Sequence, residues 1–348
     1  AVCKTRSRVE QYLLANHVEC LHLPGRSRVS ISSLGFVSDL LKTREIDVVH
    51  VHYHKDIWIP SIVLRNDRQR KLFLSIYMGV VGKNDFLHRW IYRRVNAIFT
   101  SSRALNEILP ERYPVLPEKI HLLPYGRKIG SYRRDDAKRK AIRDCYHIRD
   151  DEILVGTMVR IDPGKGALDF ARSFLYLDPQ ARSRVKFIIV GEPTRKGRGT
   201  PGESPYEPHC EAYLHEIESY IAREQIGDRL LLAGFQDDLV AFLSAMDLFV
   251  FPSRDELYSL VVLDAMAMNL PVIAARAGGN LLQVNDGQSG LMYEAGNSAD
   301  LASRIMHYLQ NPDAGPRHAA AARSFVERQH DMKNTIEQLI GFYTAPPC

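Results

Sequence analysis

The sequence lacks any cysteine arrangement typical of a disulfide framework or a zinc knuckle. It has five cysteines in 348 residues, an odd number, and no C-x-x-C pair. They are spread over the whole chain as Cys3, Cys20, Cys145, Cys210 and Cys348. Scattered cysteines of this kind favour a reducing compartment, so we expect a cytoplasmic protein.

Two kinds of segment are also missing. No stretch approaches the roughly 20 uncharged apolar residues that a membrane-spanning helix needs. The first ten residues, AVCKTRSRVE, lack both the apolar region of a signal peptide and an initiator methionine. We therefore expect that the chain starts inside a domain and that its first domain is truncated at the N-terminus.

The chain has no strong excess of charge of either sign, since its net charge is only +5. No nucleic-acid-binding motif accompanies the basic residues, which argues against nucleic acid as a partner. Basic side chains are nevertheless concentrated at 89–94 and at 127–143. Such runs are typical of solvated helix faces. They would also suit anionic lipid head groups at the inner face of the cytoplasmic membrane, or an acidic acceptor, so both interpretations stay open.

Short apolar, β-branched runs alternate with segments of helical spacing along most of the chain. The expected strands are 46–53, 71–78, 96–102, 152–159, 185–191, 229–235, 247–253 and 271–276. Alternation of this kind builds parallel sheets that are covered by helices on both faces.

A charged connector at 125–150 separates two such series of strands and helices. We therefore expect an α/β fold of two facing, Rossmann-like, doubly wound parallel-sheet domains. The first would span 1–145 and the second 146–330, and a C-terminal helix at 331–348 would pack back on the first domain. Ligands of such sheets bind at the carboxyl ends of the strands.

The most informative segment is 252–280, PSRDELYSLVVLDAMAMNLPVIAARAGGN. A helix is expected to begin near Ser259, a suitable N-cap. The free backbone N–H groups of Ser259 and Leu260, with the positive end of the helix dipole, favour a diphosphate. Asp264 lies about 7 Å deeper in the helix, where a carboxylate can accept both ribose hydroxyl protons. Glu256 precedes the helix, where the sugar of a nucleotide-sugar would extend.

A second segment, 156–166, places Arg160 and Lys165 between the end of a strand and a helical pattern. Two fixed cations over a diphosphate would stabilise the charge that builds up as a glycosidic bond breaks. These cations would take the place of a divalent metal. No D-x-D sequence at a strand end indicates a metal site. Cations in a loop more often only face solvent, but their position ahead of the acidic segment favours the functional interpretation.

In this order the two segments resemble the R-x4-K-G and E-x7-E motifs of the retaining GT-B glycosyltransferases of glycosyltransferase family 4. The resemblance implies that Arg160 and Lys165 hold the donor diphosphate, and it is most specific at 153–295. Asp264 stands where the family usually has Glu and is one methylene shorter. Leu257-Tyr258-Ser259 replaces the Gly-Phe-Gly or Ser-Phe-Ser that packs the donor sugar in the family.

The resemblance also assigns residues around the base and the sugar. Gly234-Phe235-Gln236-Asp237-Asp238 is similar to the family's G-F-x-x-D region, whose backbone contacts the base, and Gly191 would line the same pocket. An ordinary strand–turn–helix with an N-cap is the alternative. The family commonly places a His after a strand of the first domain to touch the donor sugar. Here Tyr77 takes that place, as a sugar contact or as a core aromatic.

Three histidines, His50, His52 and His54, alternate along an expected strand and share one face if the strand runs that far. Such a set could bind a transition metal. No acid or cysteine converges on it in the sequence, so we expect these side chains to pack or to line a cleft, and we expect no metal site.

The family resemblance implies a metal-independent, retaining hexosyltransferase with Glu256, Arg160 and Lys165 as catalytic residues and no cofactor besides the nucleotide-sugar substrate. The acceptor would be a saccharide or a lipid-linked saccharide of cell-envelope polysaccharide biosynthesis, with peripheral membrane contact through the basic first domain. Two alternatives stay open, a GT-B sugar-nucleotide epimerase and a non-catalytic nucleotide-sugar-binding protein. A nicotinamide dehydrogenase is disfavoured because no G-x-G-x-x-G follows a strand.

Overall fold

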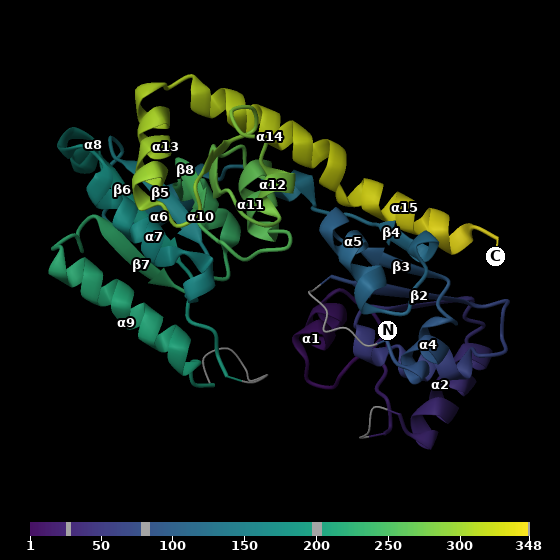
Figure 1. The fold of residues 1–348 in the computed structure, drawn as a ribbon. Helices are drawn as coiled ribbons and strands as arrows, with labels where there is room; N and C mark the ends of the chain where they lie inside the picture. Colours follow the sequence, from purple (N-terminus) through teal and green to yellow (C-terminus); the bar gives the residue numbers. More distant parts are fainter. Residues whose placement is uncertain (26–28, 78–83, 197–203, 347–348) are drawn as a thin grey trace. The chain divides into compact units, whose positions relative to one another are not determined.

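The computed structural model describes residues 1–25, 29–77, 84–196 and 204–346. They form two compact α/β units, each built on a parallel sheet (Figure 1). The first unit consists of Ala1–Pro124 and Glu337–Cys348, and the second of Tyr125–Ile336. Within the described part of the chain, no helix has both the length and the apolar character needed to cross a lipid bilayer.

The first unit contains a sheet of four parallel strands in the order β1-β2-β3-β4. The strands are β1 (Val48–Val51), β2 (Lys71–Ile76), β3 (Ala97–Thr100) and β4 (Ile120–Leu122). The helices are α1 (Arg8–Ala15), α2 (Ile31–Thr43), α3 (Trp58–Val63), α4 (Phe86–Tyr92) and α5 (Arg103–Arg112), with short 3-10 turns η1 (His54–Asp56) and η2 (Pro117–Lys119). The last helix, α15 (Met332–Thr344), ends in this unit.

Strand β2 shows how this sheet is covered on both faces, because successive side chains of a strand point to opposite sides. Leu72 and Leu74 are fully buried in a cluster with residues of α2, α3 and α4. Phe73 belongs to a separate cluster on the other side, which includes Phe99 and, from α15, Phe342. The expected amphipathic helix near the C-terminus is confirmed, and its apolar face packs on the sheet of the first unit.

The second unit contains a sheet of six parallel strands in the order β10-β9-β8-β5-β6-β7. The strands are β5 (Ile153–Met158), β6 (Val185–Val190), β7 (Leu230–Gly234), β8 (Leu248–Phe251), β9 (Val272–Ala275) and β10 (Leu291–Tyr293). The helices are α6 (Asp136–Cys145), α7 (Ala167–Ser173), α8 (Pro179–Arg184), α9 (Pro208–Arg223), α10 (Leu239–Ala245), α11 (Leu260–Ala267), α12 (Asn280–Gln283), α13 (Ser298–Gln310) and α14 (Ala314–His330), with 3-10 turns η3 (Ile129–Ser131), η4 (Pro163–Lys165) and η5 (Phe174–Tyr176).

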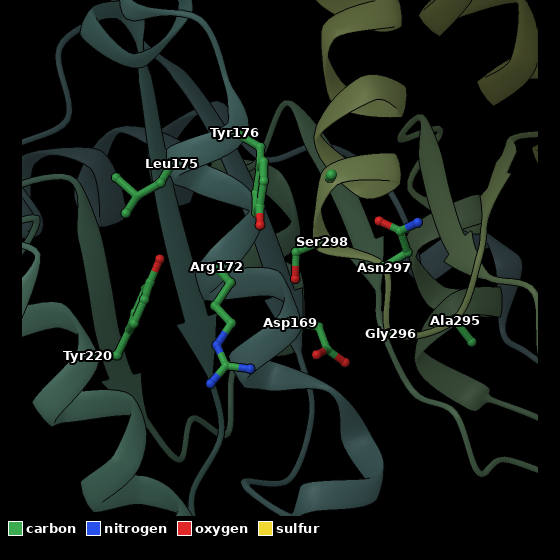
Figure 2. Close-up of a pocket in the computed structure, with 10 residues that line it drawn as sticks. Asp169, Arg172, Leu175, Tyr176, Tyr220, Ala295, Gly296, Asn297 and Ser298 are labelled. Atoms are coloured by element: carbon green, nitrogen blue, oxygen red, sulfur yellow. The ribbon is translucent and has the colours of Figure 1, made fainter.

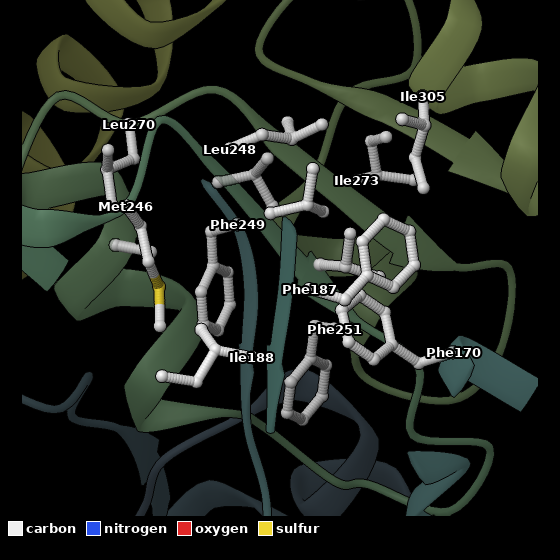
Figure 3. Packing of buried hydrophobic residues seen from close by; sticks show 14 of the residues in the cluster. Phe170, Phe187, Ile188, Met246, Leu248, Phe249, Phe251, Leu270, Ile273 and Ile305 are labelled. Atoms are coloured by element: carbon white, nitrogen blue, oxygen red, sulfur yellow. The ribbon is translucent and has the colours of Figure 1, made fainter. Parts of the chain in front are cut away.

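The central strands of this sheet are buried on both faces, as expected for a parallel sheet covered by helices. Every residue of β6 and of β8 is buried. On one face Phe187 of β6 stacks on Phe170 of α7 with ring centroids 4.6 Å apart, and on the other Phe249 of β8 and Met246 pack with Ile188 (Figure 3). Each such side chain contributes about 1.5–3 kcal/mol of transfer free energy. The sheet is therefore a rigid base for the loops at its edge.

All eight strands expected from the sequence are present, each within a residue or two of its expected bounds. The sequence pattern missed β4 and β10, which have three residues each. A run of three residues is too short to show either the period of a strand or that of a helix.

The boundary between the units lies at Pro124/Tyr125 and not at the expected 145/146. The reason is α6, which packs on α10 in the second unit. Arg139 and Arg143 of α6 both reach Asp247, with contacts of 2.7 and 3.1 Å, and Arg143 is only 3% exposed. The charge of this connector therefore partly serves packing within the second unit, so these two arginines do not belong to a basic surface.

Candidate functional site

The order of the second sheet creates a topological switch point between β5 and β8, which are neighbours in the sheet (Figure 1). The chain leaves β5 toward β6 on one side and leaves β8 toward β9 on the other, so the loops that follow the two strands diverge. Ligands of open α/β sheets bind in the crevice that this divergence leaves at the carboxyl ends. Both sequence motifs lie in these two loops, the basic one after β5 and the acidic one after β8.

The two loops are joined directly. Arg254 N–H donates to Gly164 O at 3.0 Å. Gly166 follows the turn η4 with φ +70°, and a Cβ at that position would lie 2.3 Å from Pro252 O. Only glycine accepts both this backbone conformation and this close approach. The Lys-Gly pair of the basic motif thus fixes the position of Lys165 against the acidic loop.

Lys165 and Glu256 meet at this junction. The Lys165 Nζ atom lies 3.0 Å from Glu256 Oε2 and 2.6 Å from the carbonyl oxygen of Asp255. The two side chains are 14% and 28% exposed, so the pair is partly shielded from solvent and remains reachable. The structure therefore brings together one predicted cation and the predicted sugar-binding acid.

Arg160 and Gly191 lie where the loops after β5 and β6 converge. The exposed Arg160 guanidinium donates from Nη1 to Thr194 Oγ1 at 3.4 Å, which leaves most of its donors open to solvent. Gly191 has φ +146°, and a Cβ there would lie 1.9 Å from Val159 O. Gly191 N–H donates to Gly234 O at 2.8 Å, so the loops after β5, β6 and β7 are held side by side.

Ser259 is the N-cap of α11, as expected, and its hydroxyl accepts from Val262 N–H. The expected role of its backbone N–H differs from what the structure shows. That group donates to Gln283 Oε1 at 2.9 Å, while Gln283 Nε2 donates to Ser259 O at 2.7 Å. Gln283 is buried and takes the hydrogen bonds that a diphosphate would otherwise accept from Ser259. Leu260, which is 37% exposed, is the first residue of α11. Its backbone N–H has no acceptor within the helix, as is usual in a first helical turn.

Asp264 forms a buried ion pair with Arg127. Arg127 Nε lies 2.8 Å from Oδ1, and Nη2 donates to Oδ2 at 3.0 Å; the side chains are 20% and 5% exposed. The Tyr132 hydroxyl hydrogen-bonds the same carboxylate. Burial raises the pKa of Asp264, and Arg127 and Tyr132 oppose this rise. The sequence showed no sign of this role for Arg127, because the contact joins residues 137 positions apart and leaves no local pattern.

Strand β7 and the segment after it form a strand, a turn and a capped helix. This is the structure expected if the segment does not bind a base. Gly234 ends β7 with φ +66°, and Asp238 caps α10 by accepting from Ala241 N–H at 3.0 Å. The Phe235 ring between them is 47% exposed. An exposed aromatic ring beside a glycine leaves the base-binding interpretation open as well, because a flat base can stack on it.

Tyr258, within the acidic loop, is held by a second network that the sequence did not indicate. Its hydroxyl hydrogen-bonds His330 Nε2 at 2.7 Å, and His330 Nδ1 lies 3.0 Å from Tyr125 O. Burial raises the pKa of Tyr258 and lowers that of His330. Both shifts favour the neutral forms, and the hydrogen bonds tie the acidic loop to the end of α14.

In the first unit, the strand does not run far enough for the three histidines to share one face, because β1 ends at Val51 and His54 begins η1. His50 has both ring nitrogens engaged, Nδ1 with Tyr343 Oη at 2.5 Å and Nε2 with Ser75 Oγ at 2.8 Å. Burial, and next the neighbouring His52, lower its pKa to about 3. His50 therefore packs as a neutral, doubly hydrogen-bonded ring.

Tyr77 follows β2 in the first unit, where burial raises its pKa and a hydrogen bond to Ser75 opposes the rise. The residues after it in the run compared with the family, Met78 and Gly79, lie outside the described residues. Its role as a sugar contact stays a prediction.

A pocket of about 650 Å³ lies on the second unit between α7, Tyr220 of α9 and the turn before α13 (Figure 2). None of the predicted site residues is among its ten lining residues. Asp169, which lines it, pairs with Arg254 of the acidic loop, Nε to Oδ2 at 3.0 Å. The pocket is therefore lined by other residues than those of the predicted site, and the Asp169–Arg254 pair links its wall to the acidic loop.

Comparison with known proteins agrees with the motifs. The family model described as Glycosyl transferases group 1 matches residues 138–327, and that described as Glycosyltransferase Family 4 matches 3–128. A D-inositol 3-phosphate glycosyltransferase of Acidothermus cellulolyticus is 30% identical over 256 residues, 72% of this chain and 52% of that protein. One of Nocardioides sp. is 26% identical over 322 residues, 85% of this chain and 67% of that protein. The chain thus spans about half the length of several curated relatives that it matches.

Solved structures show the same fold at low identity. The Anabaena protein HepE in complex with UDP and glucose has a TM-score of 0.74 at 20% identity, over 97% of this chain and 89% of that chain. Sucrose-phosphate synthase from Thermosynechococcus elongatus has a TM-score of 0.69 at 19% identity, over 94% and 83%. These likenesses confirm the expected GT-B fold of two Rossmann-like parallel-sheet domains. With a family model that covers the whole second sheet and both motifs, this chain belongs to the glycosyl transferases group 1 family.

Proposed function

We propose that the second unit binds a nucleotide-sugar at the switch point between β5 and β8, and that the protein is a retaining, metal-independent glycosyltransferase. The observation that supports this best is the contact between Lys165 and Glu256 across the two loops. A cation for the donor diphosphate and an acid for the donor sugar must lie close together, since the two substrate groups share one oxygen.

The diphosphate would be held by Lys165, Arg160 and the N-terminus of α11. The Lys165 ammonium has three N–H donors, of which two are directed at Asp255 O and Glu256. The third is available for a phosphate oxygen. Arg160 offers further donors from an exposed guanidinium, and Leu260 N–H adds a donor at the positive end of the helix dipole.

Asp264 would accept hydrogen bonds from the ribose hydroxyls, with Arg127 as the positioning residue that orients its carboxylate and opposes the rise of its pKa on burial. A carboxylate has about four lone-pair sites, so contacts with Arg127 and Tyr132 leave acceptor capacity. Gly191 and Gly234 would let the base approach the backbone, and Phe235 would stack on it. Tyr77 is proposed as the contact from the first unit to the donor sugar.

The reaction would proceed by breaking the bond between the anomeric carbon and the diphosphate oxygen. The two cations stabilise the charge that develops on the leaving diphosphate, as positioned donors do at other developing anions. The acceptor hydroxyl then attacks from the face that the diphosphate left, so the anomeric configuration is retained. The proton of the acceptor passes to a diphosphate oxygen. No step in this scheme requires a metal ion, because Arg160 and Lys165 supply the positive charge.

The first donor to test is UDP-glucose, because the Anabaena structure of similar fold holds UDP and glucose. The first acceptor is D-inositol 3-phosphate, which appears in the names of several relatives. A saccharide or lipid-linked acceptor of cell-envelope polysaccharide synthesis is the alternative, with peripheral membrane contact through the basic residues at 89–94, since the cluster at 127–143 belongs to the second unit.

The experiment measures UDP release from UDP-glucose with and without an acceptor, for the wild type, Glu256→Gln and Glu118→Gln. Glu118 is an exposed acid of η2 and serves as the matched control. We expect acceptor-dependent release by the wild type and by Glu118→Gln, and a loss of about 10²-fold or more in Glu256→Gln with nucleotide binding preserved.

Three results would contradict the proposal. Equal rates for both acid variants would remove Glu256 from the reaction. Formation of an epimeric sugar nucleotide without acceptor would indicate the epimerase. Binding of nucleotide-sugars without release against any acceptor would indicate the non-catalytic binding protein.

A further inference from the structure

A cluster of metal-ligating side chains lies at the start of the first unit, on three separate segments. Val2 and Leu21 form a parallel bridge, and Cys3 N–H donates to Leu21 O at 3.0 Å. This register puts Cys3 beside His22. Because side chains two residues apart in an extended chain share a face, Cys20 lies on the same side as His22.

The third segment is α1, which contributes Glu10 to the same side. Glu10 is only 9% exposed, and its Oε1 lies 2.5 Å from His22 Nε2. The second carboxylate oxygen accepts from Arg6 N–H. One ligand atom from each of Cys3, Glu10 and His22 lies within 4.8 Å of the other two, and the Cys3 thiol hydrogen-bonds that of Cys20.

We propose that Cys3, His22 and Glu10 form a binding site for one zinc ion, which Cys20 completes when its thiol, now 3.5 Å from Val18 O, turns toward the other three. Thiolate, imidazole and carboxylate are the three ligand types that Zn²⁺ takes in proteins, and four of them complete its tetrahedral shell. The mixture of sulfur and nitrogen also disfavours Mg²⁺ and Ca²⁺, which prefer oxygen.

The present spacing is close to that of a ligated site but not equal to it. Zinc bonds of about 2.0 Å to nitrogen and oxygen, at tetrahedral angles, separate the two ligand atoms by about 3.3 Å. His22 and Glu10 would therefore move apart by less than about 1 Å. The His22 side chain is 40% exposed and has room for this movement, and the Arg6 N–H bond keeps the Glu10 carboxylate oriented.

The ligand set suits a divalent cation, because an ion placed between the thiols and the carboxylate stabilises the thiolate and carboxylate forms together.

A metal ion here would fasten three segments that have little apolar packing of their own. Val9, Tyr12 and Leu14 of α1 are 61%, 63% and 55% exposed, and the two extended segments share one isolated bridge. The site shares no residue with the proposed donor site, which apart from Tyr77 is built from the second unit, so this inference does not depend on the proposed function.

A second group, Asp162, His209 and Cys210, has ligand atoms at similar spacing in the second unit. The first group has Cys20 beside Cys3 as a fourth ligand side chain, whereas the second has no such second thiol beside Cys210 among the described residues. We draw no metal site from it, but Cys210 makes a suitable matched control.

The experiment titrates the reduced, chelator-treated full chain with Co²⁺ and then displaces the cobalt with Zn²⁺. Co²⁺ reports on the site because a thiolate ligand gives charge-transfer absorption and tetrahedral geometry gives intense visible bands. The variants are Cys3→Ser, His22→Gln and the control Cys210→Ser, each checked for folding by far-ultraviolet circular dichroism.

We expect one equivalent of Co²⁺ with thiolate absorption in the wild type and in Cys210→Ser, and displacement by Zn²⁺. Cys3→Ser and His22→Gln should weaken Zn²⁺ binding by about 100-fold or more, since even outer partners of a metal site account for 10–100-fold. The proposal would be overturned if thiolate absorption were absent, if it survived in Cys3→Ser, or if only Cys210→Ser removed it. A Cys3–Cys20 disulfide with no bound metal in the protein as isolated would overturn it as well.

Discussion

Replacing Arg127 with alanine should destabilise the second unit strongly, because it leaves the Asp264 carboxylate buried without its cation. Both guanidinium contacts with this carboxylate would be lost, the 2.8 Å contact of Nε and the 3.0 Å bond of Nη2. Removing one partner of a buried pair typically costs 3–5 kcal/mol. Arg127 is 20% exposed, so water can partly replace it, and we expect about 3 kcal/mol at neutral pH.

The cost should depend on pH in a defined direction. The pKa of Asp264 is already raised by burial in the wild type, and loss of Arg127 raises it further. An acid with a raised pKa in the folded state binds its proton more tightly when folded, so stability falls as pH rises between the unfolded and folded values. In the variant this window extends to higher pH. The difference from the wild type should therefore be largest at pH 7 and shrink toward pH 4.

The assay is thermal unfolding of the wild type, Arg127→Ala and Arg134→Ala at both pH values. For a unit of this size, 1 kcal/mol shifts Tm by about 2–4 °C, so Arg127→Ala should lower Tm by roughly 6–12 °C at pH 7. Arg134 makes only an exposed pair with Asp136, and its removal should cost about 0.5 kcal/mol or less. Equal shifts for both variants, or a shift that does not change with pH, would refute the buried ion pair.

Three further predictions concern the supports of the site and of the fold. In urea unfolding, the free energy of unfolding should fall by about 1.4 kcal/mol per pH unit through His50 as the pH falls from 6.5 toward 3. The reason is that the His50 ring binds a proton in this pH range only when the chain is unfolded. His50→Gln should remove this contribution to the pH dependence. Gly166→Ala should lower the free energy of unfolding by about 1–3 kcal/mol, because φ is +70° and the new Cβ would lie 2.3 Å from Pro252 O. Gly130→Ala should be nearly neutral in the same assay, because its new Cβ would meet no atom within 4 Å. Arg143→Ala should lower the free energy of unfolding by about 3 kcal/mol or more, because it removes a buried partner of Asp247. Lys140→Ala removes only an exposed pair and should change the midpoint of unfolding little. Similar midpoints for these two variants would contradict the assignment of Arg143 to the interior.

Sequence reasoning located the motifs because their signals are local. The N-cap role of Ser259 depends on residues within one helical turn, and Lys165-Gly166 and Glu256 lie in loops between strands whose apolar runs are long enough to recognise. The parallel order of those strands then brings the two loops together, so the contact of Lys165 with Glu256 follows from the fold class.

The partners of these residues could not be read from the sequence, because they come from distant segments. Gln283 reaches Ser259 from 24 residues away, and Arg127 reaches Asp264 across 137. The contact between Cys3 and Cys20 could not be predicted either, because the bridge between Val2 and Leu21 is what brings the two cysteines together. Spacing along the chain therefore indicated the chemistry of the donor site, but not the groups that orient it.

A nucleotide-sugar site at the switch point of the second sheet should make the protein more stable when the right nucleotide-sugar is bound. Thermal unfolding would be followed with UDP-, GDP- and ADP-sugars for the wild type and for the double variant Arg160→Ala/Lys165→Ala. A ligand at about 100 times its Kd adds about 2.7 kcal/mol, so one nucleotide series should raise the Tm of the wild type and leave the double variant unchanged. If no nucleotide raises the Tm, or if the double variant responds as the wild type does, the nucleotide-sugar site does not lie at the switch point between β5 and β8.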